Sequence, residues 1–368
     1  MKILVTGSAG FIGKNLVFHL NELKIYKVIQ FTRNDGIDLL QSFVDKADAI
    51  IHLAGENRPN DEKSFDIVNT GLTKSICSAI KLTGRKIPLI FASSIQAKSD
   101  NPYGNSKRNA ELALEELAKD NESPVFIYRL PNVFGKWCKP NYNSVVATFC
   151  HNIANDLPIK VNSDSLELRL VYIDDVIAAF IKSLQSNSAG LEFIQVDIEY
   201  SITLAALVEQ IKAFKNCRNN LISENVGNGL IRALYATYIS YLPKSKFSYE
   251  VPIYGDDRGV FVEILKTKNS GQFSFFKSAP GVTRGDHYHH SKTEKFIVVK
   301  GAAQFNFRNL TTNEVYKILT SDKVPEVVES IPGWAHNITN VGKDDLIVML
   351  WANEIFNREC PDTIPCKV

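Results

Sequence analysis

The chain has 368 residues, of which 45% are hydrophobic and 22% are charged. A chain of this length is too long for one ordinary hydrophobic core, so it indicates two domains. Its composition excludes disordered and fibrous proteins. Lys and Arg total 42 against 40 Asp and Glu, which leaves a net charge of +2 without any basic block. We therefore expect no nucleic-acid partner, although a local basic cluster is enough to bind an anionic small molecule.

The N-terminal apolar run, Ile3–Val5, stops at Thr6-Gly7 and predicts a buried strand rather than a signal peptide. No stretch reaches the roughly 20 apolar residues of a membrane span, so we expect no membrane insertion. Six cysteines are scattered without a C-x-x-C pair, which is more typical of reduced thiols than of a disulfide framework. These features predict a cytoplasmic protein.

In the first 180 or so residues, short apolar runs alternate with stretches of helical periodicity. The expected strands are Lys2–Thr6, Lys27–Thr32, Ala49–Leu53, Pro88–Ser93 and Val125–Arg129, and the expected helices are Gly13–Leu23, Ser64–Leu82 and Ser106–Lys119. This alternation predicts an α/β fold with a doubly wound, Rossmann-like parallel sheet. The chain then becomes mainly helical from about Ser201 to Leu242, and we predict a domain boundary there, giving domains 1–243 and 244–368.

After residue 250, short β-type runs are separated by Gly- and Pro-containing turns. The clearest runs are Phe273–Phe276, Glu294–Val299, Gln304–Arg308 and Leu346–Trp351. Many short strands with such turns predict an antiparallel sandwich or barrel. The C-terminal domain is therefore expected to be all-β.

Three glycines, Gly7, Gly10 and Gly13, lie between the first expected strand and the first expected helix. Without side chains, the backbone can approach a pyrophosphate, and the helix N-terminus offers N–H donors. The spacing is G-x-x-G-x-x-G, and a tight turn without a ligand is the simpler alternative. The position at the start of the chain, between strand and helix, favours a dinucleotide site.

The second expected strand ends near Arg33, about 20 residues beyond the last glycine. An acidic residue there would hold a ribose 2′-hydroxyl, whereas arginine suits the 2′-phosphate of NADP. Arg33 therefore favours NADPH as the cofactor. Asp35 keeps NAD open as an alternative, and an ordinary surface cation is the second alternative for Arg33.

Tyr103 and Lys107 are four residues apart at the head of an expected helix, so both side chains share one face. A neighbouring ammonium is expected to lower the pKa of the phenol and make it a useful general acid. Ser93 and Ser94 end the preceding strand and can place a hydroxyl against a carbonyl. Tyr-x-x-x-Lys occurs by chance in many helices, but the glycine turn and the serines favour a catalytic interpretation.

Residues 1 to about 240 resemble the extended short-chain dehydrogenases/reductases of the nucleotide-sugar group. Further matches are His52-Leu53-Ala54-Gly55, Asn69, Tyr128–Gly135 and Tyr172–Val176. The resemblance implies a Ser-Tyr-Lys set of Ser94, Tyr103 and Lys107. It also implies a sugar-nucleotide wall at Asn132 and Lys136–Asn143, and a cofactor site made by Gly7, Gly10, Phe11, Ile12, Gly13, Arg33, Leu53, Ala54, Asn69, Tyr103 and Lys107. Gln96-Ala97 replace the tyrosine-glycine that often follows the serines, which leaves the choice between Ser93 and Ser94 open.

In the C-terminal domain, His287 and His289 are two residues apart in an expected strand, so they can point to the same face. Glu294 enters with the next strand and His336 with a later one. Imidazoles with one carboxylate suit zinc or another first-row divalent ion that keeps an open position. A lone histidine is usually structural, but four candidates at coherent spacing favour a metal site.

These residues are similar to both motifs of the cupin family, from Gly281 to Gly301 and from Pro332 to Asn340. The resemblance implies a cupin barrel, with the adjacent Pro332-Gly333 as a departure from the usual one-residue spacing. Asp256–Glu263 and Arg284–His287 also resemble metal-free cupins that epimerise 4-keto deoxysugars, in which the histidine of the second segment is the base.

That position is His287, and a ligated imidazole has no free lone pair for proton abstraction. We favour the ligand role because the other three ligands are present, which leaves Glu263 and His290 as weak candidates for the base.

A ketone would need both sites, because the proton beside a carbonyl is acidic and the carbonyl itself accepts hydride. Over its whole length the chain resembles the bifunctional CapF-type enzymes of capsule and O-antigen synthesis, notably at Asn101–Gly104, Phe134–Asn143 and Trp351–Glu354.

The resemblance implies that the cupin inverts C3 of UDP-2-acetamido-2,6-dideoxy-L-arabino-4-hexulose. The reductase would then use NADPH at C4 to give UDP-2-acetamido-2,6-dideoxy-L-talose, on the route to UDP-N-acetyl-L-fucosamine. It also implies zinc and a homodimer. The alternatives are a reductase whose cupin is a structural or substrate-binding module, and a non-enzymatic sensor, which the Ser-Tyr-Lys set disfavours.

Overall fold

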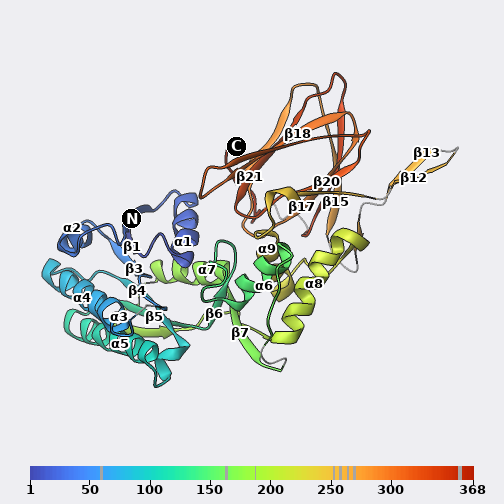
Figure 1. The fold of residues 1–368 in the computed structure, drawn as a ribbon. Helices are drawn as coiled ribbons and strands as arrows, with labels where there is room; N and C mark the ends of the chain where they lie inside the picture. The colour runs from blue at the N-terminus through green and yellow to red at the C-terminus, as the bar shows by residue number, and fades with distance from the viewer. Residues whose placement is uncertain are drawn as a thin grey trace. The chain divides into compact units, whose positions relative to one another are not determined.

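The computed structural model describes residues 1–58, 61–161, 165–186, 188–251, 253–256, 259–262, 265–267, 271–354 and 359–368. The chain forms two compact units (Figure 1). The first comprises Met1–Ser144 and Leu168–Ser201, and the second comprises Val145–Glu167 and Ile202–Val368. Among the described residues, no helix is both long and apolar enough to cross a bilayer. All six cysteines are free thiols.

The first unit is built on a six-stranded parallel sheet with the strand order β2-β1-β3-β4-β5-β8. Its strands are β1 (Lys2–Thr6), β2 (Lys27–Phe31), β3 (Ala49–His52), β4 (Leu89–Ser94), β5 (Val125–Leu130) and β8 (Leu191–Ile194). The central strands are apolar on both faces, as in sheets covered by helices on both sides. The predicted Rossmann-like parallel sheet is thereby confirmed.

Helices α2 (Leu40–Asp45), α4 (Leu72–Thr83) and α5 (Pro102–Asn121) share one buried apolar cluster with the sheet. Helices α1 (Phe11–Glu22) and α7 (Ile173–Leu184) contact each other. The expected helix at 64–82 is not one regular helix. It begins as α3 (Lys63–Phe65), passes through a π-helical turn and continues as α4. That turn, η2 (Asp66–Gly71), carries the buried side chain of Asn69.

Several shorter elements complete the chain before residue 250. Strands β6 (Asn132–Phe134) and β7 (Glu167–Tyr172) pair in parallel beside the main sheet. The remaining elements are η1 (Ile37–Leu39), η3 (Ile95–Lys98), β9 (Tyr200–Thr203), β10 (Ile222–Ser223) and η4 (Lys244–Lys246).

The second unit contains two antiparallel five-stranded sheets, with strand orders β11-β20-β17-β22-β15 and β19-β18-β21-β16-β23. Their strands are β11 (Ser248–Glu250), β15 (Gln272–Ser278), β16 (Thr283–Tyr288), β17 (Glu294–Lys300), β18 (Ala302–Asn309), β19 (Val315–Ser321), β20 (Glu326–Glu329), β21 (Trp334–Asn340), β22 (Leu346–Ala352) and β23 (Ile364–Pro365). Three further short strands are β12 (Ile253–Asp256), β13 (Gly259–Val262) and β14 (Lys266–Thr267). Alternate residues of β18, namely Ala303, Phe305 and Phe307, are buried, as expected for a strand with one inner face. The predicted all-β C-terminal domain is confirmed.

Three helices belong to this second unit: α6 (Val145–Ala154), α8 (Leu204–Asn220) and α9 (Gly229–Ile239). Helix α6 contacts α8 and α9. Compactness therefore groups these helices with the β sheets. The predicted boundary between residues 243 and 244 divides the chain by function rather than by compactness, and it stays a prediction.

A buried charge cluster links α8 to the sheet within this unit. Arg218 of α8 and Lys295 of β17 both form ion pairs with Glu329 of β20. The ammonium of Lys295 also donates to the hydroxyl of Tyr249 at 3.1 Å, and the guanidinium of Arg218 lies 4.6 Å from the centre of the same ring. One carboxylate thus compensates two cations away from solvent.

We predict that Glu329→Gln lowers the free energy of unfolding by about 3–5 kcal/mol, because it leaves two buried cations without a counter-charge. Asp156→Asn is the matched control, since Asp156 pairs with Lys215 and Lys246 while its side chain is 58% exposed. That exposed network should contribute less than about 1 kcal/mol. Denaturant unfolding of the three proteins gives the comparison, and equal losses in both variants would contradict a stabilising role for the cluster.

Candidate functional site

The glycine turn connects β1 to α1 and is held by close backbone contacts. Gly7 has φ +69°, and a Cβ at this position would lie 2.7 Å from the backbone N of Ala54. A Cβ on Gly13 would lie 2.2 Å from the carbonyl oxygen of Gly7. Neither position tolerates a side chain, and Gly10, the N-cap residue of α1, provides no side-chain cap. The first N–H groups of α1 are therefore left for an anion, as a dinucleotide site requires.

A buried hydrogen-bond chain fixes the loop after β3 against this turn. The Thr6 hydroxyl oxygen accepts the N–H groups of Leu53 and Ala54, both at 3.2 Å, and lies 2.7 Å from His52 Nδ1. The other ring nitrogen of His52 lies 2.9 Å from the hydroxyl of Thr73. Burial, with a smaller effect from the Lys107 charge, lowers the pKa of His52 to about 3, so the ring is neutral. His52 is a structural residue of the site.

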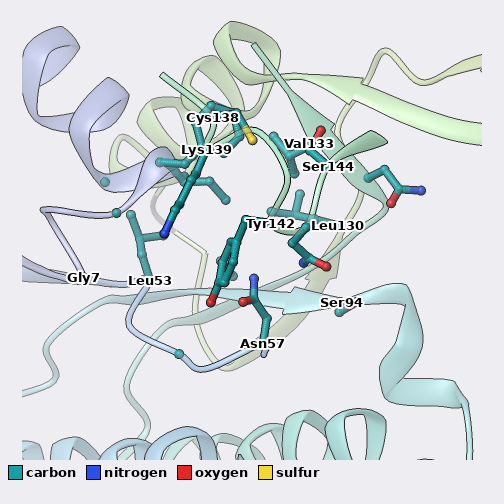
Figure 2. Close-up of a pocket in the computed structure, with 18 of the residues that line it drawn as sticks. Gly7, Leu53, Asn57, Ser94, Leu130, Val133, Cys138, Lys139, Tyr142 and Ser144 are labelled. Carbon is teal, nitrogen blue, oxygen red and sulfur yellow. The ribbon is translucent and has the colours of Figure 1, made fainter. Parts of the chain in front are cut away.

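A cavity of about 760 Å³ opens at this edge of the first unit (Figure 2). Nine of the residues expected to bind the cofactor line it: Gly7, Gly10, Phe11, Ile12, Gly13, Arg33, Leu53, Tyr103 and Lys107. The same cavity is lined by Asn132 and by most of the expected sugar-nucleotide loop, including Trp137–Pro140, Tyr142 and Asn143. The strand order changes direction between β1 and β3, and such a switch point is where open α/β sheets bind ligands.

The Ser-Tyr-Lys candidates come together at this cavity. Asn101 caps α5 by accepting the N–H of Gly104 at 2.8 Å, which places Tyr103 and Lys107 in the first turns. The ammonium of Lys107 is buried and donates to the carbonyl of Ala92 at 3.0 Å. Burial lowers the pKa of Lys107 to about 8, against a smaller raising effect of Glu111.

The pKa of Tyr103 is raised rather than lowered, because burial outweighs its hydrogen bond with Ser94. We expected the ammonium of Lys107 to lower this pKa, but the ammonium is directed at a backbone carbonyl instead.

The two serines have different partners. Ser93 donates to the buried carboxylate of Glu111 at 2.6 Å, and Glu111 is further held by Arg129 and Arg108. Ser94 is the hydroxyl that interacts with Tyr103. The geometry therefore favours Ser94 over Ser93 as the partner of the phenol.

At the end of β2, Arg33 is 81% exposed and pairs with Glu56 at 2.9 Å. The carboxylate of Asp35 accepts both the N–H and the hydroxyl of Thr32, each at 2.8 Å. These donors occupy Asp35, whereas Arg33 lines the cavity.

Two expected cofactor residues do not line the cavity. Ala54 lies against Gly7, and Asn69 is buried, donating to the carbonyl of Glu56 at 3.0 Å and to Ser106 at 2.9 Å. Both support the loop after β3 from behind. Glu56, which lines the cavity, also accepts from the hydroxyl of Tyr142 at 3.4 Å. The sequence offered no signal for Glu56.

Lys136 is the one cation of the expected sugar-nucleotide loop that is buried away from the cavity. Its side chain is 1% exposed and its ammonium pairs with Asp174 at 3.1 Å. Lys139 instead lines the cavity, with its ammonium 5.1 Å from the centre of the Tyr142 ring.

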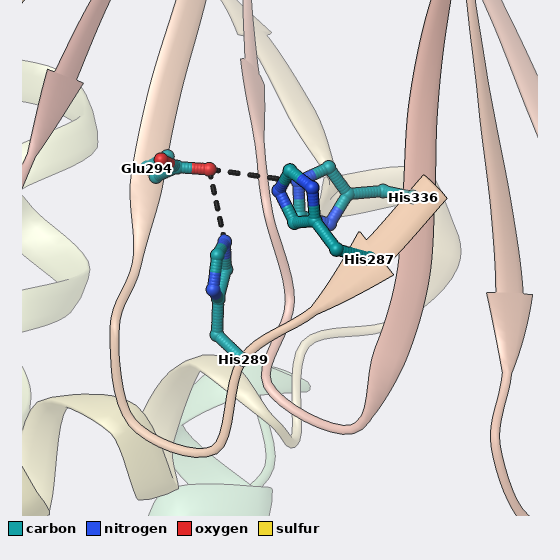
Figure 3. A group of neighbouring side chains, drawn as sticks. All are labelled: His287, His289, Glu294 and His336. Atoms are coloured by element: carbon teal, nitrogen blue, oxygen red, sulfur yellow. Dashed lines mark hydrogen bonds and ion pairs between the residues drawn. The ribbon is translucent and has the colours of Figure 1, made fainter. Parts of the chain in front are cut away.

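The four expected metal ligands also come together, in the second unit (Figure 3). Antiparallel pairing of β16 with β21 places His287 opposite His336, and a bulge at Gly285 adjusts the approach of His287. Glu294 Oε2 lies 3.0 Å from His289 Nε2 and 3.5 Å from His336 Nε2. One potential ligand atom from each residue lies within 4.8 Å of all the others.

The chemistry of this donor set fits a divalent metal. His336 is buried, its Nδ1 has no hydrogen-bond partner among the described residues, and its Nε2 has the 3.5 Å contact with Glu294 Oε2. Burial, followed by the neighbouring His336 and His289, lowers the pKa of His287 to about 4, so this imidazole is neutral. Neutral imidazoles with an ionised carboxylate are what zinc and its neighbours bind.

The two candidates for an epimerase base are Glu263 and His290. Glu263 lies outside the described residues. His290 is buried, its ring packs 5.4 Å from that of Tyr288, and its backbone N–H donates to Asp362 at 2.8 Å. It does not belong to the four-residue cluster.

Residues 3–202 match the NAD dependent epimerase/dehydratase family, and residues 254–364 match the polysaccharide biosynthesis C-terminal domain. A UDP-2-acetamido-2,6-beta-L-arabino-hexul-4-ose reductase from Pseudomonas aeruginosa is 54% identical over 368 residues, covering 100% of this chain and 99% of the relative. The crystal structure of the capsular polysaccharide assembling protein CapF from Staphylococcus aureus is 40% identical, with a TM-score of 0.68 and complete coverage of both chains. A dTDP-4-dehydro-6-deoxyglucose reductase from Escherichia coli is 27% identical, covering 57% of this chain and 80% of the relative.

We predict that Gly13→Ala weakens NADPH binding at least about tenfold, because the new methyl group would displace the turn and its N–H donors to an anion. Gly71→Ala is the control: its Cβ would lie 3.8 Å from the nearest backbone oxygen, and its backbone is already helical. Calorimetric titration with NADPH provides the dissociation constants. Equal affinity in Gly13→Ala and the wild type would exclude this turn as the pyrophosphate site.

Proposed function

This chain belongs to the CapF-type family of UDP-2-acetamido-2,6-dideoxy-L-arabino-hexul-4-ose reductases, and we propose that it reduces the C4 ketone of that UDP-sugar. The observation that carries the proposal is the end-to-end similarity to the Pseudomonas aeruginosa reductase. The cavity supports it, because Ser94, Tyr103 and Lys107 line the same space as the glycine turn.

In the proposed reaction, NADPH supplies a hydride to C4 when it is bound. Tyr103 donates its phenolic proton to the carbonyl oxygen, so that one hydride and one proton convert the ketone into an alcohol. Ser94 orients the phenol through their hydrogen bond. Lys107, with a pKa of about 8, carries its positive charge in most molecules at neutral pH, and its hydrogen bond to the carbonyl of Ala92 keeps this charge at the wall of the cavity.

Preference for NADPH over NADH is part of the same proposal. Its support is the position of Arg33 at the cavity and the engagement of Asp35 by Thr32. A guanidinium can bind a 2′-phosphate through charge-assisted hydrogen bonds.

Arg33→Gln is therefore expected to weaken NADPH binding by about 10- to 100-fold, the range for losing a hydrogen bond to a charged group of 1.5–3 kcal/mol. NADH binding should change little. Lys27→Gln, which removes an exposed cation at the opposite end of β2, is the matched control. If titrations show that the affinities for NADPH and NADH fall equally, or that neither falls, Arg33 does not bind the 2′-phosphate.

We also propose that the cupin domain, residues 244–368, epimerises C3 of the same ketone before reduction. His287, His289, Glu294 and His336 would hold a zinc ion, which would supply Lewis acidity toward a carbonyl. The proton at C3 is acidic only while the neighbouring ketone exists, so inversion has to precede reduction. The product would be UDP-2-acetamido-2,6-dideoxy-L-talose on the route to UDP-N-acetyl-L-fucosamine. The family resemblance further supports a homodimer in the cytoplasm.

The two activities are separable by complementary variants. Tyr103→Phe is expected to lower NADPH oxidation by at least about 100-fold, because the general acid is lost, while C3–deuterium exchange in D2O continues. His289→Ala should do the reverse, with exchange lost and reduction of keto-sugar already inverted at C3 retained.

Exchange is followed by NMR without NADPH, and reduction by absorbance at a saturating concentration of the C3-inverted keto-sugar. Absence of deuterium at C3 in the wild-type protein would reject the epimerase proposal and leave a reductase with a structural or substrate-binding cupin. Loss of both activities in either variant would contradict independent sites.

A further inference from the structure

The segment 359–368 is packed against the loop that carries the metal ligands. Strand β23 pairs with β16, placing Pro365 opposite His287 and Ile364 opposite Tyr288. The N–H of Cys366 donates to the carbonyl of Asp286 at 2.7 Å. Pro365 and Cys366 therefore lie beside His287, an expected metal ligand, and beside the residue that precedes it.

Asp362 makes the densest set of these contacts. Its Oδ1 accepts the N–H of His290 at 2.8 Å, and its Oδ2 accepts the N–H groups of Ser291 at 2.8 Å and Lys292 at 2.7 Å. Oδ2 also accepts the hydroxyl of Ser291 at 3.1 Å. Three consecutive N–H groups of the turn between β16 and β17 therefore converge on one carboxylate.

The backbone carbonyl of Asp362 contacts a metal ligand directly. It lies 2.5 Å from His289 Nδ1 and can only accept, so Nδ1 carries the proton. Nε2, which lies 3.0 Å from Glu294 Oε2 inside the ligand cluster, is therefore the ring nitrogen that is left to bind a metal ion. Ligating histidines commonly have their other nitrogen fixed in this way, and loss of such a partner weakens metal binding.

A second link reaches Glu294. The ammonium of Lys292 lies 3.1 Å from Glu294 Oε1 and donates to the hydroxyl of Thr363 at 3.3 Å. Glu294 therefore keeps Oε2 toward the histidines while Oε1 faces Lys292. The segment 359–368 thus supports two ligands, one through a carbonyl and one through a lysine.

We propose that Asp362 is a positioning residue of the metal site: its carboxylate holds the turn at residues 290–292, and its carbonyl selects the His289 tautomer that binds a metal through Nε2. This inference rests on the proposed metal site. The affinity of the four ligands for the metal then depends on Asp362, which is distant in sequence from both cupin motifs.

Competition titration of the full chain with Zn²⁺ and a chelator of known affinity tests the proposal. Asp362→Ala should raise the Zn²⁺ dissociation constant about 10- to 100-fold, the range typical of such supporting partners. Asp362→Asn should be intermediate, because its amide oxygen can replace one acceptor while its NH₂ group opposes the other N–H donors. Asp322→Ala is the matched control, since Asp322 also accepts a backbone N–H, from Gly301 at 2.9 Å, at an exposed turn.

Substitution of the metal by Co²⁺ adds a measurement that a general loss of protein stability does not change. The visible absorption of bound Co²⁺ should change in both Asp362 variants and remain unchanged in Asp322→Ala. Equal Zn²⁺ affinity in Asp362→Ala and the wild type overturns the positioning role while leaving the metal site intact. If Asp362→Ala does not fold, an unchanged dissociation constant in Asp362→Asn overturns it equally. Failure of the wild-type chain to bind Zn²⁺ overturns the metal site and this inference together.

Discussion

The candidate reductase site depends on one contact between backbone segments, where Gly7 meets Leu53 and Ala54 at the carboxyl ends of β1 and β3. Thr6 locks the contact, because its hydroxyl accepts both N–H groups of the incoming loop. A side chain at Gly7 would separate the two loops and close the space that the pyrophosphate requires. The ends of the neighbouring strands β4 and β5 extend the same edge, and their residues Ser93, Ser94 and Leu130 line the cavity.

Burial lowers the pKa of a basic group at each site, but the two groups differ in protonation state at neutral pH. For the imidazole of His287, burial lowers the pKa to about 4 and leaves the ring neutral, the form that metals bind. For Lys107, burial lowers the pKa only to about 8, so the group still carries a proton in most molecules at neutral pH. The buried carbonyl of Ala92 accepts from this ammonium and keeps it in place. The same physical effect therefore prepares ligands in one unit and a supporting cation in the other.

Residues whose spacing follows the period of a strand or helix were predictable from the sequence, whereas residues that act through tertiary contacts were not. Tyr103 with Lys107, and His287 with His289, follow helical and strand periods and reach the sites as expected. Asn69 lies behind the cavity because a π-helical turn, which the apolar pattern does not reveal, carries it. Asp362 had no local signal, since its partners are about 70 residues away in the chain.

Reduction destroys the ketone on which inversion depends, and this imposes a requirement on the reductase cavity if both proposed activities are present. The cavity has to distinguish the two C3 configurations, because reduction of the uninverted sugar would trap it as the wrong alcohol. The wall formed by the glycine turn and Leu53 contacts the cofactor in the proposed arrangement and cannot read C3. Among the residues that line the cavity, Asn132 and Tyr142 offer polar groups outside the glycine turn for this discrimination. The hydrogen bond from Tyr142 to Glu56 ties Tyr142 to the loop after β3.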